Sequence, residues 1–336
     1  MKTEAMLYDQ KADKKVHCHL CSHHCLIPES EYGFCRVRQN IDGRLYTHVF
    51  GRPIARHVDP IEKKPLYHFL PGTWSYSVAT AGCNFHCGFC QNWQISQIDE
   101  KNGSAFRMPA VQPAEIANAA LENGCRSISY TYTEPTIFFE YAFEISKSAA
   151  EKGLSNVFVT NGYMTRRALD AAAPYLNAAN VDIKAFRDSY YQNNCEARLK
   201  PVLDSVKYMK RLGIWVEVTT LIIPDENDSE AELDDLAGFI AETGVEIPWH
   251  ISRFHPDYRF TDHSATPEET LIKAREIGTK NGLRYIYLGN IPADNDTYCH
   301  QCGEKVVHRT ARQVLKKNLN QGLCGACGAR IDGVWE

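Results

Sequence analysis

Three cysteines lie within eight residues of the chain, in the segment 83–90 with the sequence CNFHCGFC. Their spacing is C-x3-C-x2-C, so one short loop supplies three thiolates. A structural zinc ion takes four ligands, and so does a [4Fe–4S] cluster that is ligated by protein alone. The loop therefore predicts either a metal ion that borrows a distant ligand or a cluster with one iron left open.

An open iron has a specific use in radical chemistry. It binds S-adenosylmethionine (SAM) through the methionine amino and carboxylate groups, and one electron from the cluster then breaks a carbon–sulfur bond. The product is a 5′-deoxyadenosyl radical, and this chemistry belongs to the cofactors that the protein positions. The alternatives are a zinc site and a chance group of cysteines. We favour the cluster because Phe89 precedes the last cysteine and because a strand is expected just before the loop.

Two further groups of cysteines lie near the ends of the chain. They are Cys18, Cys21, Cys25 and Cys35, and Cys299, Cys302, Cys324 and Cys327. The second group forms two C-x2-C pairs, each followed by glycine, which is typical of a zinc ribbon; zinc is favoured over a second iron–sulfur cluster. The first group suits zinc by its spacing, and an auxiliary iron–sulfur cluster is the alternative.

Four histidines accompany the N-terminal cysteines: His17, His19, His23 and His24. They are candidate substitute ligands, although a solvent-exposed histidine is the more common situation. Segments as small as the two ends of this chain bury too little apolar surface to fold unaided, so we expect both to depend on metal. The remaining cysteines, Cys125 and Cys195, are interpreted as small apolar core residues.

The composition describes a soluble globular protein, because 44% of its 336 residues are hydrophobic and 23% are charged. No apolar run is long enough to span a bilayer, and the charged first residues do not form a secretory signal, so we expect a cytoplasmic protein. Thirteen cysteines then indicate metal ligands rather than disulfides.

A net charge of −4 disfavours duplex nucleic acid as a partner. The basic segment 306–320 is interpreted as a solvated face, with a partner or RNA contact as the alternative.

The middle of the chain must position the three-cysteine loop, and its hydrophobic pattern alternates between strands and helices. Strands are predicted at 74–82, 127–133, 156–162, 180–186, 215–224, 248–254 and 283–290. Helices are predicted at 113–123, 137–152, 165–176, 201–212, 229–243 and 267–281. Repeated strand–helix units predict an α/β fold, a partial or full (β/α) TIM-type barrel of parallel strands. We expect an N-terminal metal-binding segment at 1–70, the barrel at 71–291 and a zinc-ribbon-like domain at 292–336.

Polar residues follow the predicted strands at the point where each strand ends. They are Glu134, the turn 160–162, Asp182 with Lys184, Thr219 with Thr220, and His255. Chemistry in a barrel of this kind sits at the carboxyl ends of the strands. These residues are therefore expected to share one pocket with the cysteine loop.

The sequence C-x3-C-x2-C-Q-N-W resembles the radical SAM superfamily and, within it, the pyruvate formate-lyase activating enzyme group. The N-terminal stretch 18–46, together with FHP and YLGN later in the chain, is similar to the AmmeMemoRadiSam system radical enzyme family. This resemblance implies a [4Fe–4S] cluster on Cys83, Cys87 and Cys90, completed by SAM. It also implies a reductant such as flavodoxin or ferredoxin, and Memo-like and AMMECR-like partner proteins.

The same resemblance implies cofactor-binding roles for individual residues. Phe89 would border the adenine, Asn92 belongs to the Q-N-W sequence, Glu134 would receive the methionine amino group, Asn161 lies in a cofactor-side turn, Asp182 and Lys184 would bind the ribose or the carboxylate, and His255 would lie near the adenine. One departure concerns the G-G-E-P sequence of the superfamily. Tyr132 and Thr133 stand here in place of the two glycines.

The function predicted from these features is a radical SAM enzyme that abstracts hydrogen from an unidentified substrate. No catalytic residue beyond the cluster ligands is required for that step. Two substrate hypotheses compete: a glycyl-radical enzyme as the protein substrate of an activase, or an RNA or metabolite as the substrate of a modifying enzyme. A non-catalytic metal-binding scaffold is the remaining alternative.

Overall fold

The structure is a computed structural model that describes residues 3–98 and 107–336. Its centre is an eight-stranded sheet in the order β14-β13-β12-β11-β10-β9-β8-β7. The strands are β7 (Ala55–Pro60), β8 (Trp74–Ala79), β9 (Ser127–Tyr130), β10 (Ser155–Thr160), β11 (Ala178–Asp182), β12 (Trp215–Ile222), β13 (Trp249–Arg253) and β14 (Ile286–Gly289). Strands β8 to β14 are parallel neighbours, and β7 pairs antiparallel with β8. Because β7 and β14 are the two edges, the barrel is partial.

Helices connect the parallel strands, as the alternating pattern predicts. The longer ones are α2 (Pro113–Glu122), α3 (Phe139–Glu151), α4 (Arg166–Ala172), α6 (Leu199–Arg211), α7 (Glu230–Thr243) and α8 (Glu268–Lys280). The short ones are η1 (Ile61–Lys63), α1 (Trp93–Ser96), η3 (Pro135–Phe138), α5 (Asp188–Tyr190) and the π-helix η4 (Tyr191–Cys195). In the described part of the chain, none of the helices combines the length and the apolar character needed to cross a membrane.

Local sequence signals account for several helix starts. Proline occupies the first position of α2, where its missing N–H costs nothing. The Ser229 hydroxyl accepts a hydrogen bond from the backbone of Glu232 and caps α7. All four residues of β9 are buried, as expected for a parallel strand covered on both faces. These local signals agree with the elements that the sequence predicts at 113–123, 127–133 and 229–243.

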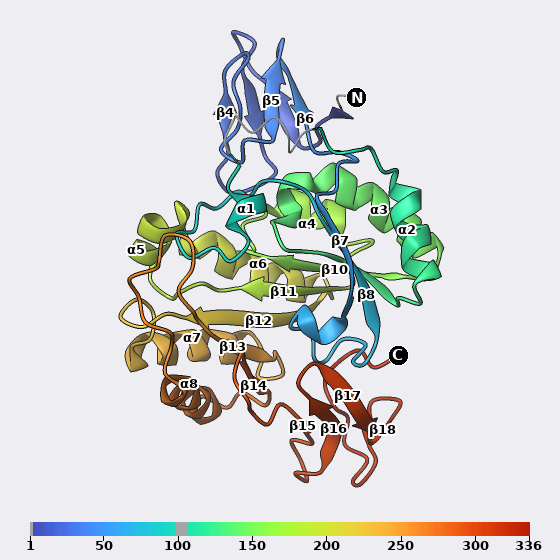
Figure 1. Ribbon diagram of the computed structural model, residues 1–336, viewed down its shortest axis with the longest axis vertical. Coiled ribbons are helices and arrows are strands. Elements are labelled where there is room, and N and C mark those ends of the chain that lie inside the picture. Colours follow the sequence, from blue (N-terminus) through green and yellow to red (C-terminus); the bar gives the residue numbers. More distant parts are fainter. Residues whose placement is uncertain (1–2, 99–106) are drawn as a thin grey trace.

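The N-terminal segment forms two small antiparallel sheets at one end of the molecule (Figure 1). One contains β1 (Thr3–Glu4), β5 (Arg38–Ile41) and β6 (Arg44–Thr47); the other contains β2 (Tyr8–Gln10), β3 (Val16–Cys18) and β4 (Leu26–Ile27). Arg38 forms a buried ion pair with Glu140 of α3, and the same carboxylate accepts the backbone N–H of Met6 at 2.7 Å. This ion pair anchors the segment to the barrel.

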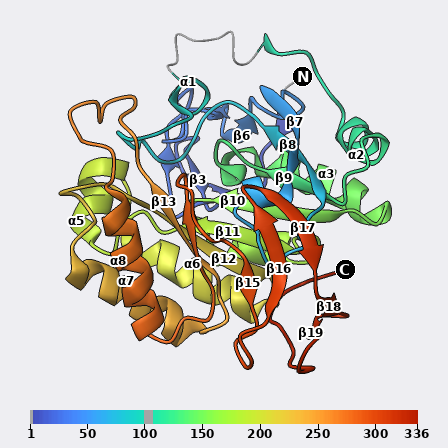
Figure 2. The same cartoon turned by 60° about the horizontal axis from the view of Figure 1, so that its bottom comes forward.

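The C-terminal segment forms a small β-structure at the opposite end (Figures 1 and 2). Its strands are β15 (Thr297–Tyr298), β16 (Lys305–Thr310), β17 (Gln313–Lys317), β18 (Leu319–Asn320) and β19 (Leu323–Cys324). It shares a separate apolar cluster with Tyr67, Tyr285 and Tyr287. The interpretation of 306–320 as a solvated face is wrong for Arg309, which is buried and donates hydrogen bonds to the Tyr67 carbonyl and to Thr297.

Strand β7 and helix η1 lie before residue 70, yet β7 is a strand of the central sheet. The sequence predicts no strand there, because ARHVDP is mostly polar and lacks the apolar alternation of a half-buried strand. The division of the chain into three segments stays a prediction.

Candidate active site

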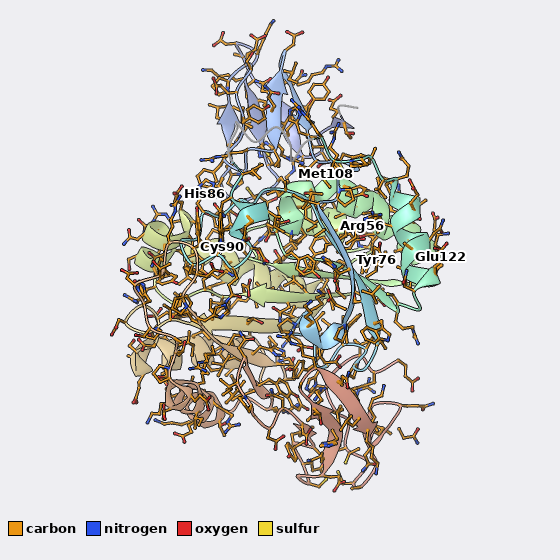
Figure 3. The ribbon with its side chains drawn as sticks, in the orientation of Figure 1. Arg56, Tyr76, His86, Cys90, Met108 and Glu122 are labelled. Atoms are coloured by element: carbon orange, nitrogen blue, oxygen red, sulfur yellow. The ribbon has the colours of Figure 1, made fainter. Side chains whose placement is uncertain are left out.

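A cavity of about 410 Å³ lies at the carboxyl ends of the central strands. Nine of the predicted site residues line it: Cys83, Cys87, Phe89, Cys90, Asn92, Glu134, Asn161, Asp182 and Lys184. Figure 3 shows Cys90 close to α1, at the end of the sheet to which the strand arrows point. The chain thus brings the cysteine loop and the strand-end polar residues to one place.

The backbone of the cysteine loop is held on both sides. It begins at Gly82, whose φ of +101° favours glycine; a Cβ there would also come within 2.7 Å of Val37. The π-helix η4 then receives two backbone hydrogen bonds from the loop, one of them from His86 N to the Cys195 carbonyl at 3.1 Å. Three free thiols therefore sit in a fixed loop against a cavity, a donor set that fits a cluster with one open iron.

Cys195 lies beside this loop, although its isolated position in the sequence predicts a small apolar core residue. Its side chain is buried, and a hydrogen bond from its thiol lowers the pKa of Cys87. A lone cysteine far along the chain carries no spacing signal, so sequence reasoning had no means of connecting the two. The contact makes Cys195 a natural comparison for the three loop cysteines.

Glu134 is almost fully buried at the edge of the cavity. Its Oε1 accepts hydrogen bonds from Thr136 N at 3.0 Å and from Thr160 Oγ1 at 2.7 Å, and its Oε2 accepts the N–H of Asn161 at 2.8 Å. Burial nevertheless raises the pKa of this carboxyl group. Since a carboxylate offers about four acceptor sites, Oε2 has room for one more donor from the cavity.

Tyr132 shows how the chain replaces the first glycine of the superfamily sequence. Its φ is +66°, a left-handed conformation that glycine adopts more easily. The strain is offset by contacts: the hydroxyl hydrogen-bonds Asp59, and Lys64 Nζ lies 4.4 Å from the ring centroid. Asn92 Nδ2 also donates to the Tyr132 carbonyl at 2.9 Å, which ties the cysteine loop to the Glu134 turn.

Asn161 and the Asp182–Lys184 pair occupy neighbouring strand ends. Asn161 Nδ2 donates to Asn84 Oδ1 at 2.7 Å and lies 4.0 Å from Cys83 Sγ. Lys184 Nζ lies 2.7 Å from Asp182 Oδ2. Burial opposes the charge of Lys184, but the neighbouring carboxylate outweighs it and raises the lysine pKa. The lysine therefore stays charged next to the cavity.

Two predicted strand-end residues lie elsewhere. His255 is exposed and is not among the residues that line the cavity, so its role near an adenine stays a prediction. Thr219 lines the cavity, but the Thr220 hydroxyl accepts a hydrogen bond from Trp249 Nε1 at 3.0 Å. Successive residues of a strand point to opposite faces, so only one of the two threonines reaches the cavity.

Three cationic residues at the rim were not predicted as site residues: Lys63 and Lys64 of the η1 region, and Arg312 from the turn between β16 and β17. Burial lowers the pKa of Lys64 to about 8, although it pairs with Asp59 at 2.7 Å. Arg312 forms no ion pair within the described residues. It also lines a second, adjoining cavity of about 920 Å³, so the small β-structure of β15–β19, called the C-terminal ribbon from here on, reaches the mouth of the site.

The outer cysteine groups differ in geometry. The sulfurs of Cys299, Cys302, Cys324 and Cys327 all lie within 4.8 Å of one another, a cluster that suits metal binding. The N-terminal four are packed in or against the main core, and Arg38 Nη1 donates to Cys18 Sγ at 3.3 Å. Within the described residues, they do not form a comparably tight group.

Comparison with known proteins adds to this geometry. A family model of the radical SAM superfamily matches residues 77–237. An uncharacterised protein of Methanocaldococcus jannaschii is 44% identical over 334 residues, covering 98% of each chain. A putative glycyl-radical enzyme activating enzyme of the same organism is 25% identical over 239 residues, covering 69% of this chain and 85% of that protein.

A similar fold occurs among solved structures. SuiB of Streptococcus suis, bound to its precursor peptide SuiA, matches with a TM-score of 0.51 and 15% identity, over 69% of this chain and 52% of that chain. At that identity the likeness concerns the fold alone.

Proposed function

The chain belongs to the radical SAM superfamily, and we propose that Cys83, Cys87 and Cys90 hold a [4Fe–4S] cluster completed by SAM. One observation carries this proposal: the three thiols open into the same cavity as Glu134 and Lys184. The chemistry supplied by a cluster and SAM bound there is a one-electron cleavage that provides a radical for hydrogen abstraction.

The chain's own residues would bind and orient the cofactor. Glu134 would accept the methionine amino group on Oε2, the oxygen with a single donor from the protein. Lys184 would neutralise the carboxylate as a point charge. Phe89 lines the cavity and would border the adenine, and the ring of Phe260, with its centroid 5.6 Å away, packs against Phe89. Asn92, Asn161, Asp182 and His255 are proposed as further cofactor contacts.

The substrate is proposed to bind between the barrel and the C-terminal ribbon. Lys63 and Lys64 share one carboxylate, Asp59, and Arg312 adds a further positive charge to the lining of the cavity. A substrate with a carboxylate or phosphate group would balance that charge. The relatives' names favour a glycyl-radical enzyme as substrate, whereas the ribbon at the mouth favours a modifying enzyme with a docking module.

Other parts of the proposal concern metals and partners. We propose zinc for the C-terminal cysteines and zinc or an auxiliary iron–sulfur cluster for the N-terminal ones. Membership of the AmmeMemoRadiSam system family, with Memo-like and AMMECR-like partner proteins, is a further proposal that rests on the N-terminal stretch 18–46 together with FHP and YLGN. Flavodoxin or ferredoxin is proposed as the reductant because the cleavage needs one electron, and a cytoplasmic location is also proposed.

The experiment that separates the substrate classes uses reconstituted protein without oxygen. A cell extract is divided by ultrafiltration into macromolecules and a small-molecule filtrate, and 5′-deoxyadenosine is quantified after adding SAM, reductant and each fraction. Stimulation by macromolecules supports a protein or RNA substrate, which protease and nuclease treatment then distinguish. Stimulation by the filtrate alone overturns the activase hypothesis. Arg312→Ala should reduce the stimulation, and Lys316→Ala, an exposed residue of β17, serves as the control.

A further inference from the structure

Three histidines of the N-terminal segment gather on its surface. His17, His19 and His24 each offer a ring nitrogen, and these three nitrogens lie within 4.8 Å of one another. The ring centroids of His17 and His19 are 4.2 Å apart, and that of His24 lies 6.1 and 6.3 Å from them. Nitrogens on a tetrahedral zinc ion would be about 3.3 Å apart, given Zn–N bonds of about 2.0 Å. Small side-chain rotations would therefore close the group around a metal.

The strand pleat separates these histidines from the neighbouring cysteines. In β3, Val16 and Cys18 are buried whereas His17 is partly exposed, and His19 continues the outer face. The side chain of Cys18 points inward and meets Arg38. The two residue types alternate in sequence, but they belong to opposite sides of the strand.

His24 reaches the same face through a turn. Its φ is +47°, and its N–H donates to the Cys21 carbonyl at 3.1 Å. This turn returns the chain to pair with β3, where His17 lies opposite Leu26. The exposed His24 ring is thereby brought over the outer face beside His17 and His19.

Asp9 provides the support that a ligating histidine usually has. It lies opposite His17 in the β2–β3 ladder, and its Oδ2 is 2.7 Å from His19 Nε2. A carboxylate bound to a histidine ring fixes the orientation of the ring and raises its basicity as a metal ligand.

A metal held by these three histidines would have its fourth coordination position open to a cavity. His19 and His24 line a cavity of about 440 Å³ that also contains Arg166, Arg167 and Lys200. Three imidazoles without a thiolate suit zinc and the neighbouring divalent transition metals, and three protein ligands with an open position are typical of a site that binds a further ligand. Lys200 pairs with Asp204 of the same lining at 2.6 Å, so it is Arg166 and Arg167 that favour an anion in that position.

We propose that His17, His19 and His24 form a divalent transition-metal site, supported by Asp9 and open to a basic cavity. It is separate from the four N-terminal cysteines and does not depend on the radical SAM assignment.

The test uses the full-length holoprotein, treated with a weak chelator that leaves cysteine-bound metals in place, and titrated with zinc by calorimetry. One zinc equivalent should bind to the wild type and to His57→Ala, which changes an exposed histidine of β7. His24→Ala and His17→Ala/His24→Ala should lose it, and Asp9→Ala should weaken it about 10- to 100-fold. Circular dichroism checks that each variant is folded. Because His24 is exposed, His24→Ala is expected to fold like the wild type.

Cobalt then identifies the ligands. In the proposed site cobalt should show ligand-field bands without sulfur-to-cobalt charge-transfer bands. The proposal is overturned if zinc binding is unchanged in His24→Ala, or if the same histidine variants remove a sulfur-to-cobalt band, because the histidines would then complete the cysteine site.

Discussion

The two outer cysteine groups differ in how the segments around them are stabilised. At the C-terminus the four sulfurs lie within 4.8 Å of one another, Cys302 and Cys327 are exposed, and the surrounding apolar cluster is small and separate. At the N-terminus the cysteines are packed in or against the main core, and a buried ion pair joins the segment to α3. A metal should therefore be the main support of the ribbon, whereas the barrel supports the N-terminal segment as well.

The anchors of the two segments also differ in chemistry. The N-terminal anchor is the charged pair Arg38–Glu140. The C-terminal anchor includes His68, which is fully buried and hydrogen-bonds the Asp332 carbonyl and the Tyr287 hydroxyl, each at 2.6 Å. Removing either Arg38 or Glu140 would break the N-terminal anchor. Protonation of the neutral His68 ring would weaken the C-terminal anchor.

Metal removal should have the largest effect, and it should be confined to the ribbon. Structural zinc sites contribute on the order of 10 kcal/mol to the folding of small domains. A strong chelator should therefore make 299–336 sensitive to protease while the barrel stays intact, and the N-terminal segment should respond less. Limited proteolysis with mass spectrometry measures this order. Loss of the N-terminal segment before the ribbon would contradict the comparison.

Glu140→Ala should have the next largest effect, because it leaves the buried charge of Arg38 without its carboxylate partner. Removing one member of a buried ion pair typically lowers the free energy of unfolding by roughly 3–5 kcal/mol. Denaturant unfolding measures the loss. The matched control is Glu144→Ala, one turn further along α3, whose pair with Lys147 is exposed and should contribute less than about 1 kcal/mol. Equal effects of the two substitutions would show that the ion pair is not an anchor.

Acid should weaken the C-terminal anchor by a smaller amount. Burial lowers the pKa of His68 to about 4, below its ordinary value of 6.5. The unfolded chain therefore takes up the proton first, so the stability that this residue contributes is complete above pH 6.5 and is lost as the pH falls towards 4. The full loss corresponds to about 3 kcal/mol. Melting temperatures of the wild type between pH 7.5 and 5 should fall more steeply than those of His68→Gln; parallel curves would contradict this.

The sequence predicts the centre of the molecule better than its ends. The parallel strands and their helices follow from apolar runs that end at glycine or at capping residues, which are local signals. The edge strand β7, the Arg38–Glu140 pair and the contribution of Arg312 depend on contacts between distant segments. No local pattern carries those contacts.

The candidate site shows the same division. The C-x3-C-x2-C spacing of Cys83, Cys87 and Cys90 predicts their role as cluster ligands. Glu134 and Lys184 could be assigned to the same pocket because the carboxyl ends of parallel strands converge. Cys195 and Lys64 have no such spacing and enter the site through tertiary packing. Tyr132 adopts a backbone conformation expected of glycine, and only its contacts with Asp59 and Lys64 explain why the chain tolerates it.

The central claim is that three cysteines, and no fourth, hold the reactive cluster. It is tested most directly by measuring 5′-deoxyadenosine formed from SAM and dithionite by anaerobically reconstituted protein. The wild type and Cys195→Ala should form it, whereas Cys83→Ala should form none while its circular dichroism spectrum stays unchanged. Undiminished 5′-deoxyadenosine in Cys83→Ala, or its loss in Cys195→Ala, would contradict the account.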